Sequence, residues 1–113
     1  MSSITTHVLD TARGKPAEGV PVVLETEAAG AWKTLGSGRT DADGRVRAGL
    51  APPGAVNNGT YRLRFDTAAY FRALGLETFF PEVAIAFTIR DATKPHHVPL
   101  LLSPFGYTTY RGS

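Results

Sequence analysis

The stretch VAIAFTI, residues 83–89, alternates large and small side chains. Its large residues are Val83, Ile85, Phe87 and Ile89. Successive side chains of an extended strand point to opposite faces, so these four residues share one face and the smaller residues share the other. The stretch is therefore predicted to form a β-strand that packs one face against a hydrophobic core.

The same period of two recurs on both sides of this stretch. In YRLRF, residues 61–65, two arginines alternate with Tyr61, Leu63 and Phe65. Further strands are predicted at ITTHVL (4–9), GVPVVLET (19–26), AWKTLGS (31–37), HVPLLL (97–102) and GYTTY (106–110). The segments RGKP, DADG, APPG and NNG, which lie between strands, have the composition of turns.

One segment, TAAYFRALGL at residues 67–76, favours a helix. Asp66 or Thr67 can cap its start, and Gly75 can end it. Seven or eight strands with one short helix indicate a mostly β fold built as a two-sheet sandwich. A chain of 113 residues has the length of one domain, so we expect a single domain over residues 1–113.

Composition excludes several classes of protein. The chain has no cysteine, which rules out a disulfide framework, thiolate chemistry and a cysteine-based zinc site. Its net charge is only +2, with acidic and basic residues interspersed, so a nucleic-acid partner is not expected. No apolar run approaches the ~20 residues of a membrane span, and the first ten residues lack the features of a signal peptide. We therefore expect a cytoplasmic protein without a membrane partner.

Three histidines are the only side chains whose unperturbed pKa lies near neutrality. His7 shares a strand face with Thr5 and Leu9, opposite a more apolar face, so it is predicted to point out of the sandwich. A surface histidine without a role is the simpler interpretation. His96 and His97 are consecutive and point to opposite faces, so they cannot easily bind one metal ion together, and no metal site is expected.

The stretch GRTDADGRVR, residues 38–47, contains a β-turn and three arginines. Arg39, Arg45 and Arg47 are solvated charges by default, although one of them could stabilise an oxyanion. Periodicity does not select which one. The chain has no HExxH, no G-x-S-x-G and no glycine-rich phosphate loop, so standard hydrolase and nucleotide-binding motifs are absent.

The last stretch, HVPLLLSPFGYTTYRGS at residues 97–113, joins an apolar run to a Pro-Phe-Gly turn and an alternating strand. In that strand Thr108 and Tyr110 lie opposite Tyr107, Thr109 and Arg111. An outward face rich in leucine and tyrosine indicates a subunit interface. An ordinary edge strand is the alternative.

Five segments of the chain, in their order along the sequence, are similar to segments of a known protein family: THVLD (6–10), DADGR (41–45), TAAYF (67–71), FFPEV (79–83) and HVPLLLSPFGYTTYRGS (97–113). The chain resembles the 5-hydroxyisourate hydrolase family, the transthyretin-related enzymes of purine degradation, and the final YRGS is the most specific element. The resemblance implies a transthyretin-like sandwich of eight strands and one short helix. It also implies hydrolysis of 5-hydroxyisourate to 2-oxo-4-hydroxy-4-carboxy-5-ureidoimidazoline without a cofactor. A homotetramer with active sites between its dimers is implied as well.

The resemblance also assigns residues to the site. The implied catalytic residues are His7, Arg45, His97 and Ser113. The implied substrate-binding residues are His7, Arg45, Tyr110, Arg111, Gly112 and Ser113. Either histidine can act as the general base, with His7 the first choice, and Arg45 would stabilise charge on the carbonyl oxygen. The hydroxyl and α-carboxylate of Ser113 would orient a histidine or bind the ring, which would explain why the sequence ends there.

The chain departs from the family at one place. The family commonly has His-Tyr-His before Val-Pro, whereas this chain has Pro95, His96 and His97. Two other functions are alternatives: a non-catalytic, transthyretin-like carrier of a small molecule, and an immunoglobulin-like interaction module. A carrier of an apolar ligand would need an apolar lining, against which the histidines and arginine argue.

Overall fold

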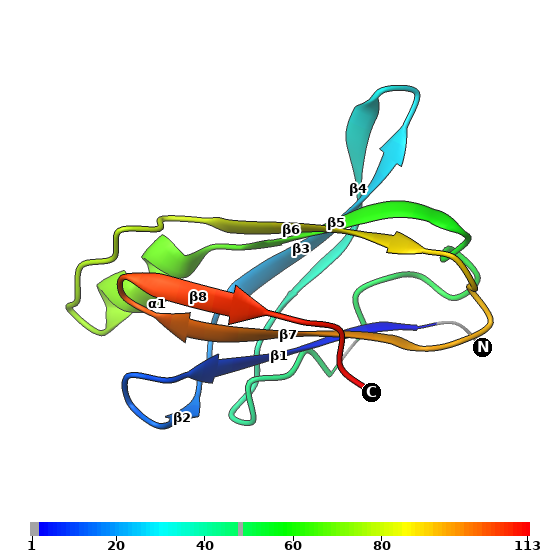
Figure 1. Cartoon of the computed structure of the whole chain (residues 1–113). Coiled ribbons are helices and arrows are strands. Elements are labelled where there is room, and N and C mark those ends of the chain that lie inside the picture. The colour runs from blue at the N-terminus through cyan, green and yellow to red at the C-terminus, as the bar shows by residue number, and fades with distance from the viewer. Residues whose placement is uncertain (1–2, 48) are drawn as a thin grey trace.

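The computed structural model describes residues 3–47 and 49–113, and its strands form two sheets packed face to face (Figure 1). One sheet has the order β2 (Lys15–Pro16), β1 (Ile4–Asp10), β7 (His96–Ser103), β8 (Gly106–Thr109). The other has the order β4 (Ala31–Arg39), β3 (Pro21–Ala28), β5 (Gly59–Phe65), β6 (Val83–Ile89). The predicted transthyretin-like two-sheet sandwich with one short helix is confirmed, with eight strands in the described residues.

The inward faces of the sheets form the core, as the alternation predicts. Leu63 and Phe65 of β5 and Val83 of β6 have no solvent exposure, and Ile85 and Ile89 are also buried. The arginines of YRLRF lie on the outer face, where they form ion pairs with Glu25 and Glu82.

Helix α1 (Thr67–Ala73) follows β5 and lies at one end of the sandwich (Figure 1). The Asp66 carboxylate caps it by accepting a hydrogen bond from the main-chain N–H of Ala69, at 3.0 Å. The helix is shorter than the predicted 67–76 because the chain turns at Gly75, where φ is +72°. Within the described residues, no helix is long and apolar enough to cross a bilayer.

A second difference from the prediction lies in RGKP, which was expected to be only a turn. Lys15 and Pro16 form the short strand β2, antiparallel to the end of β1. Predicted strands otherwise correspond to observed ones, with boundaries that agree to within two residues.

The pairing of β1 with β7 determines where the candidate site lies. These strands are parallel, and their register places Thr5 beside His97 and His7 beside Pro99. The two ends of the described chain consequently lie at the same end of the molecule (Figure 1). Residues about 90 positions apart in the sequence are thereby neighbours on one sheet.

Candidate active site

Strand β1 presents His7 on the outer face of its sheet. Ile4, Thr6 and Val8 are buried, His7 is half-buried and Thr5 is exposed. The predicted outward direction of His7 is therefore confirmed. Because β7 runs parallel to β1, His97 lies on the same outer face, one strand away.

The DADGR turn packs against β1 at His7. The Asp41 carboxylate accepts hydrogen bonds from the main-chain N–H groups of Asp43, at 2.9 Å, and Arg45, at 3.0 Å. At Gly44 φ is +80°, and an added Cβ would lie 2.3 Å from the carbonyl oxygen of Val8, so only glycine fits. The Val8 N–H donates to the Gly44 carbonyl at 2.8 Å, and the main chains of Arg45 and His7 form a β-bridge.

The structure separates the roles of the two arginines in this turn. Arg47 pairs with Asp41 and Asp43, and these ion pairs raise its pKa. The pKa of Asp41 is lowered, first by the hydrogen bond from the main chain of Arg45 and then by Arg47. Arg45 forms no ion pair with any residue that the structure describes, and its exposed side chain faces the cleft beside His97.

The end of the chain closes the other side of His97. The N–H of Gly112 donates to the carbonyl of His97 at 2.8 Å. An added Cβ on Gly112 would lie 2.6 Å from Cδ2 of His97 and 3.3 Å from Cγ of Pro99. Gly112 therefore allows the main chain to contact the imidazole ring directly.

These elements surround an open cleft of about 360 Å³. Its lining residues are Ser3, Thr5, Arg45, Pro95, His97, Gly112 and Ser113. The structure thus brings Arg45, His97 and Ser113 together, and it places His7 next to them through the bridge to Arg45.

The environment of His97 favours its neutral form. Burial lowers the pKa of His97, and the charges of Arg45 and His7 lower it further. A hydrogen bond to the main chain of Thr5 acts in the opposite direction without cancelling these effects. The ring is therefore able to accept a proton at neutral pH.

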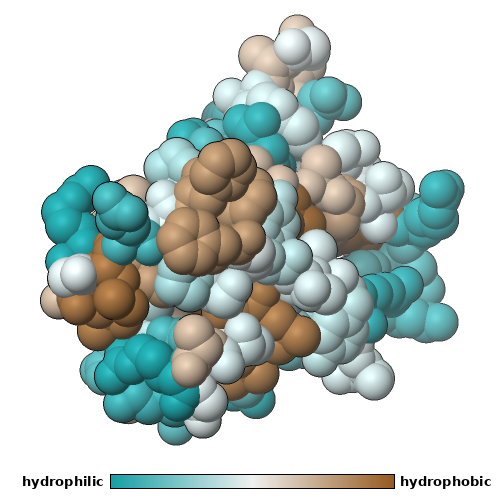
Figure 2. All heavy atoms as spheres, turned by 60° about the vertical axis from the view of Figure 1, so that its left-hand side comes forward, coloured by the Kyte–Doolittle hydropathy of each residue, from teal (hydrophilic) through white to brown (hydrophobic). Residues whose placement is uncertain are grey.

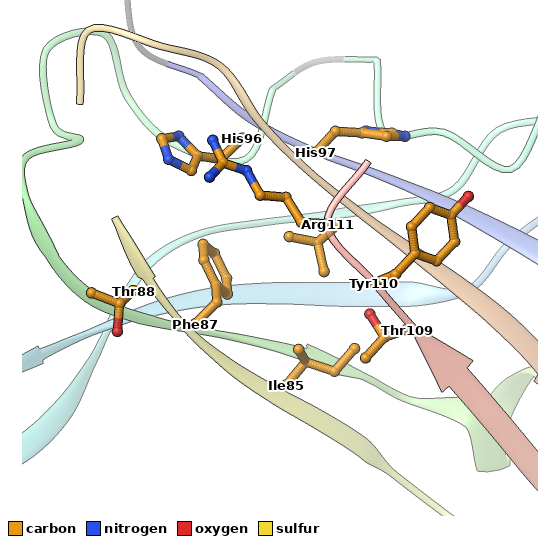
Figure 3. A pocket seen from close by; sticks show the side chains of 9 residues that line it. Ile85, Phe87, Thr88, His96, His97, Thr109, Tyr110 and Arg111 are labelled. Atoms are coloured by element: carbon orange, nitrogen blue, oxygen red, sulfur yellow. The ribbon is translucent and has the colours of Figure 1, made fainter. Parts of the chain in front are cut away.

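Two residues assigned to substrate binding, Tyr110 and Arg111, line a different cavity of about 140 Å³ between the sheets (Figure 3). His96 and His97 also line it, so this cavity adjoins the cleft at His97, and Figure 3 shows the rings of His96 and His97 pointing to opposite sides. His96 is buried, and its Nδ1 donates to the carbonyl of Lys94 at 3.0 Å. The predicted opposite orientation of the two histidines is confirmed.

Sequence reasoning missed Thr5 as a site residue. Its hydroxyl lies 2.8 Å from Nδ1 of His97. The period of two places Thr5 on the face of His7, but nothing in the sequence pairs this strand with β7. Among the residues described, no group of three or more histidine, aspartate or glutamate side chains is arranged to hold a metal ion.

The two-sheet sandwich, with a polar cleft on the outer face of the sheet that contains β1 and β7, defines a transthyretin-like protein with a site for a small polar molecule. The family model described as HIUase/Transthyretin family matches residues 4–112, and the chain belongs to this family. It is 49% identical over 110 residues to the 5-hydroxyisourate hydrolase of Salmonella dublin, covering 97% of this chain and 80% of that protein.

Solved structures agree with this assignment. The 5-hydroxyisourate hydrolase of Klebsiella pneumoniae is 39% identical, with a TM-score of 0.86 over 100% of this chain and 94% of its own. Sea bream transthyretin in complex with thyroxine is 32% identical, with a TM-score of 0.90 over 96% of this chain and 93% of its own. The fold is therefore shared by a 5-hydroxyisourate hydrolase and a transthyretin that binds thyroxine, and the chemistry of the cleft has to distinguish the two functions.

Proposed function

We propose that His97, His7 and Arg45 form the centre at which this chain hydrolyses 5-hydroxyisourate. The relatives named as 5-hydroxyisourate hydrolases support this activity. The observation that carries the site assignment is the placement of a histidine with a lowered pKa beside an unpaired arginine in one cleft. Perturbed titratable groups in a cleft are typical of catalytic sites.

In the first step, neutral His97 accepts a proton from water as the water oxygen bonds to the ring carbonyl carbon. General-base help of this kind contributes about 10²- to 10⁴-fold. The carbonyl oxygen becomes an oxyanion, and the guanidinium of Arg45 stabilises it with fixed N–H donors that stay protonated.

In the second step, the tetrahedral carbon expels the ring nitrogen as the C–N bond breaks. The nitrogen takes a proton from protonated His97 or from protonated His7, and the carbonyl carbon becomes the carboxyl group of 2-oxo-4-hydroxy-4-carboxy-5-ureidoimidazoline, which ionises by releasing one proton to solvent. Atoms and charge balance with one water consumed and one proton released, and neither a cofactor nor a metal ion takes part in the step. Ser113 contributes its hydroxyl to substrate binding from the opposite wall of the cleft.

A carrier function, the alternative suggested by transthyretin, fits the cleft less well. Thyroxine is large and aromatic, whereas the walls around His97 are formed mostly by hydroxyl groups, an imidazole and a guanidinium. Arg45 would be buried against an apolar ligand without a counter-charge, which is costly.

We also propose a homotetramer with its active sites between dimers. Large apolar side chains are exposed at the end of the molecule formed by α1 and the β7–β8 turn (Figure 2). Phe79 there is 72% exposed and Phe105 71%, and Tyr110, which follows β8 near His97, is 54% exposed, which is more apolar surface than an isolated chain of this size needs to show. Sedimentation at micromolar concentration tests this assembly, and a monomer would contradict it.

Activity is tested by ultraviolet absorbance with freshly prepared 5-hydroxyisourate, after subtraction of the spontaneous rate. We expect rapid decay with the wild-type chain and at least a 10²-fold lower turnover for His97→Asn, with unchanged circular dichroism. Thyroxine binding without hydrolysis would instead establish the carrier.

A further inference from the structure

Thr5, on the neighbouring strand, contacts the ring of His97. The hydroxyl oxygen of Thr5 is 2.8 Å from Nδ1. This contact follows from the β1–β7 register, which makes Thr5 and His97 direct partners on one sheet face.

We infer that Thr5 is a positioning residue, which holds the hydrogen of His97 on Nδ1 and so leaves the lone pair of Nε2 free to accept the proton of water. The inference rests on the proposed role of His97 as the general base. Thr5 does not contact the reacting atoms, and it acts through the ring of His97.

The direction of the hydrogen bond between Thr5 and Nδ1 decides the tautomer. A threonine hydroxyl can donate or accept, and His97 can act as a base at Nε2 only if the hydroxyl accepts a hydrogen bond from an Nδ1–H. Neutral imidazole has one N–H, so Nε2 is left without a hydrogen.

The remaining contacts of the ring support this orientation. The Cδ2 side of the ring lies against Gly112, so the ring is held between Thr5 on one edge and the main chain of Gly112 on the other. No hydrogen bond reaches Nε2 from any residue within 3–47 or 49–113. The site therefore contains a fixed ring whose basic nitrogen has no protein partner.

The opposite tautomer would disable this base. With the hydrogen on Nε2, the Thr5 hydroxyl would donate to Nδ1, and the ring could donate to water at Nε2 but could not take its proton there. If only a fraction of the His97 rings carried the hydrogen on Nδ1, kcat would fall in proportion to that fraction. Substrate binding, and with it KM, would change little.

The first experiment measures the tautomer directly. Long-range ¹H–¹⁵N correlation spectra of uniformly ¹⁵N-labelled chain, recorded above the pKa of His97 and assigned with His97→Asn, distinguish an Nδ1–H from an Nε2–H ring. We expect Nδ1–H in the wild-type chain. An Nε2–H ring for His97 would overturn the inference, even if His97→Asn were inactive and the proposed function stood.

The second experiment compares Thr5→Val, Thr5→Ser and Thr108→Val. Valine keeps the shape and the strand preference of threonine but lacks its hydroxyl, serine retains the hydroxyl, and Thr108 is an exposed threonine on the same sheet. We expect Thr5→Val to lower kcat about tenfold with KM changed less than twofold, because the ring loses the partner at Nδ1 while the shape of the cleft is kept. Thr5→Ser should recover most of this loss.

Thr108→Val should keep wild-type kinetics, and circular dichroism should show that all three variants fold. The inference would be contradicted if Thr5→Val had the same kcat as the wild type. It would also be contradicted if Thr5→Ser did not recover the kcat that Thr5→Val loses. Full activity of His97→Asn would instead remove His97 from the proposed mechanism, and the spectra would still report whether Thr5 sets the tautomer.

Discussion

The main chain of Gly112 lies directly against the imidazole of His97, with no space for a side chain between them. Gly112→Ala should therefore displace either the ring or the last residues of the chain. Since a displacement of about 1 Å at a catalytic group costs on the order of 10²-fold in rate, we expect a loss of that size in kcat with little change in melting temperature.

Gly106→Ala is the matched control for this variant. A Cβ at Gly106 would meet only the Ser103 hydroxyl, at an ordinary 3.7 Å. Absorbance kinetics and thermal melting should show near-normal values for Gly106→Ala. Wild-type kcat in Gly112→Ala would mean that the contact with His97 has no part in catalysis.

Arg45 and Arg47 provide a second matched pair, two positions apart in one turn. Arg45→Ala should lower kcat/KM by about 10²- to 10³-fold, the effect of removing one oxyanion donor. Arg47→Ala removes only exposed ion pairs to Asp41 and Asp43, so we expect activity within about tenfold of wild type. If Arg47→Ala lowered kcat/KM more than Arg45→Ala in the hydrolysis assay, the oxyanion role proposed for Arg45 would be wrong.

The lowered pKa of His97 predicts the acidic limb of the pH profile. Burial, then Arg45 and His7, hold this pKa below the ordinary 6.5, so kcat/KM should rise with pH along a limb whose midpoint lies below pH 6.5. In Arg45→Ala the pKa should move up, which NMR titration of the ring measures without activity.

The same shift affects stability, and its sign is fixed. A histidine with a lowered folded-state pKa stabilises the fold fully above pH 6.5, and this contribution is lost as the pH falls through the folded-state value. A His97 midpoint at or above 6.5 in the wild-type titration would contradict both statements.

His96→Tyr should be mild, although its neighbour in the sequence, His97, is the proposed general base. His96 lies in the cavity between the sheets and faces away from the cleft, and the 140 Å³ of space beside it leaves room for a phenol ring. We expect kcat within about tenfold of wild type, against a loss of at least 10²-fold for His97→Asn. If His96→Tyr were inactive but folded, the cavity would have a role that the mechanism above does not contain.

A buried contact remote from the cleft offers a test of stability alone. The hydroxyl of Tyr70 donates to the buried carboxylate of Asp10 at 2.7 Å, and burial raises the pKa of Tyr70 to about 12. Tyr70→Phe should lower the free energy of unfolding by about 1–3 kcal/mol, because Asp10 loses a donor. Urea unfolding measures this, and Tyr107→Phe, at an exposed tyrosine, should change it by less than about 0.5 kcal/mol.

Sequence alternation predicted most of the fold because it reports directly which face of a strand is buried. It placed Leu63 and Phe65 inside and His7 outside, and all three placements are confirmed. It did not reveal the parallel pairing of β1 and β7, since each strand has the same alternation whichever neighbour it takes. The short strand β2 was also missed, because two residues carry no periodicity.

For the site, residue type alone left Arg39, Arg45 and Arg47 equivalent, and only the resemblance selected Arg45. The structure gives the physical reason: Arg47 is held by two aspartates and Arg45 faces the cleft. Tyr110 and Arg111 line the cavity between the sheets, which adjoins the cleft at His97. Their assignment to substrate binding stays a prediction.

The parallel pairing of β1 with β7 also bears on how the chain becomes active. Thr5 and His97 meet across 92 positions of sequence, so the cleft forms only after a very long loop has closed. Loop closure of this kind is slow compared with hairpin formation, and the β3–β4 and β7–β8 hairpins can form long before it. During refolding from urea, hydrolytic activity should therefore return later than the β-sheet signal in circular dichroism. In protein synthesis, a growing chain that does not yet include β7 could not contain the site.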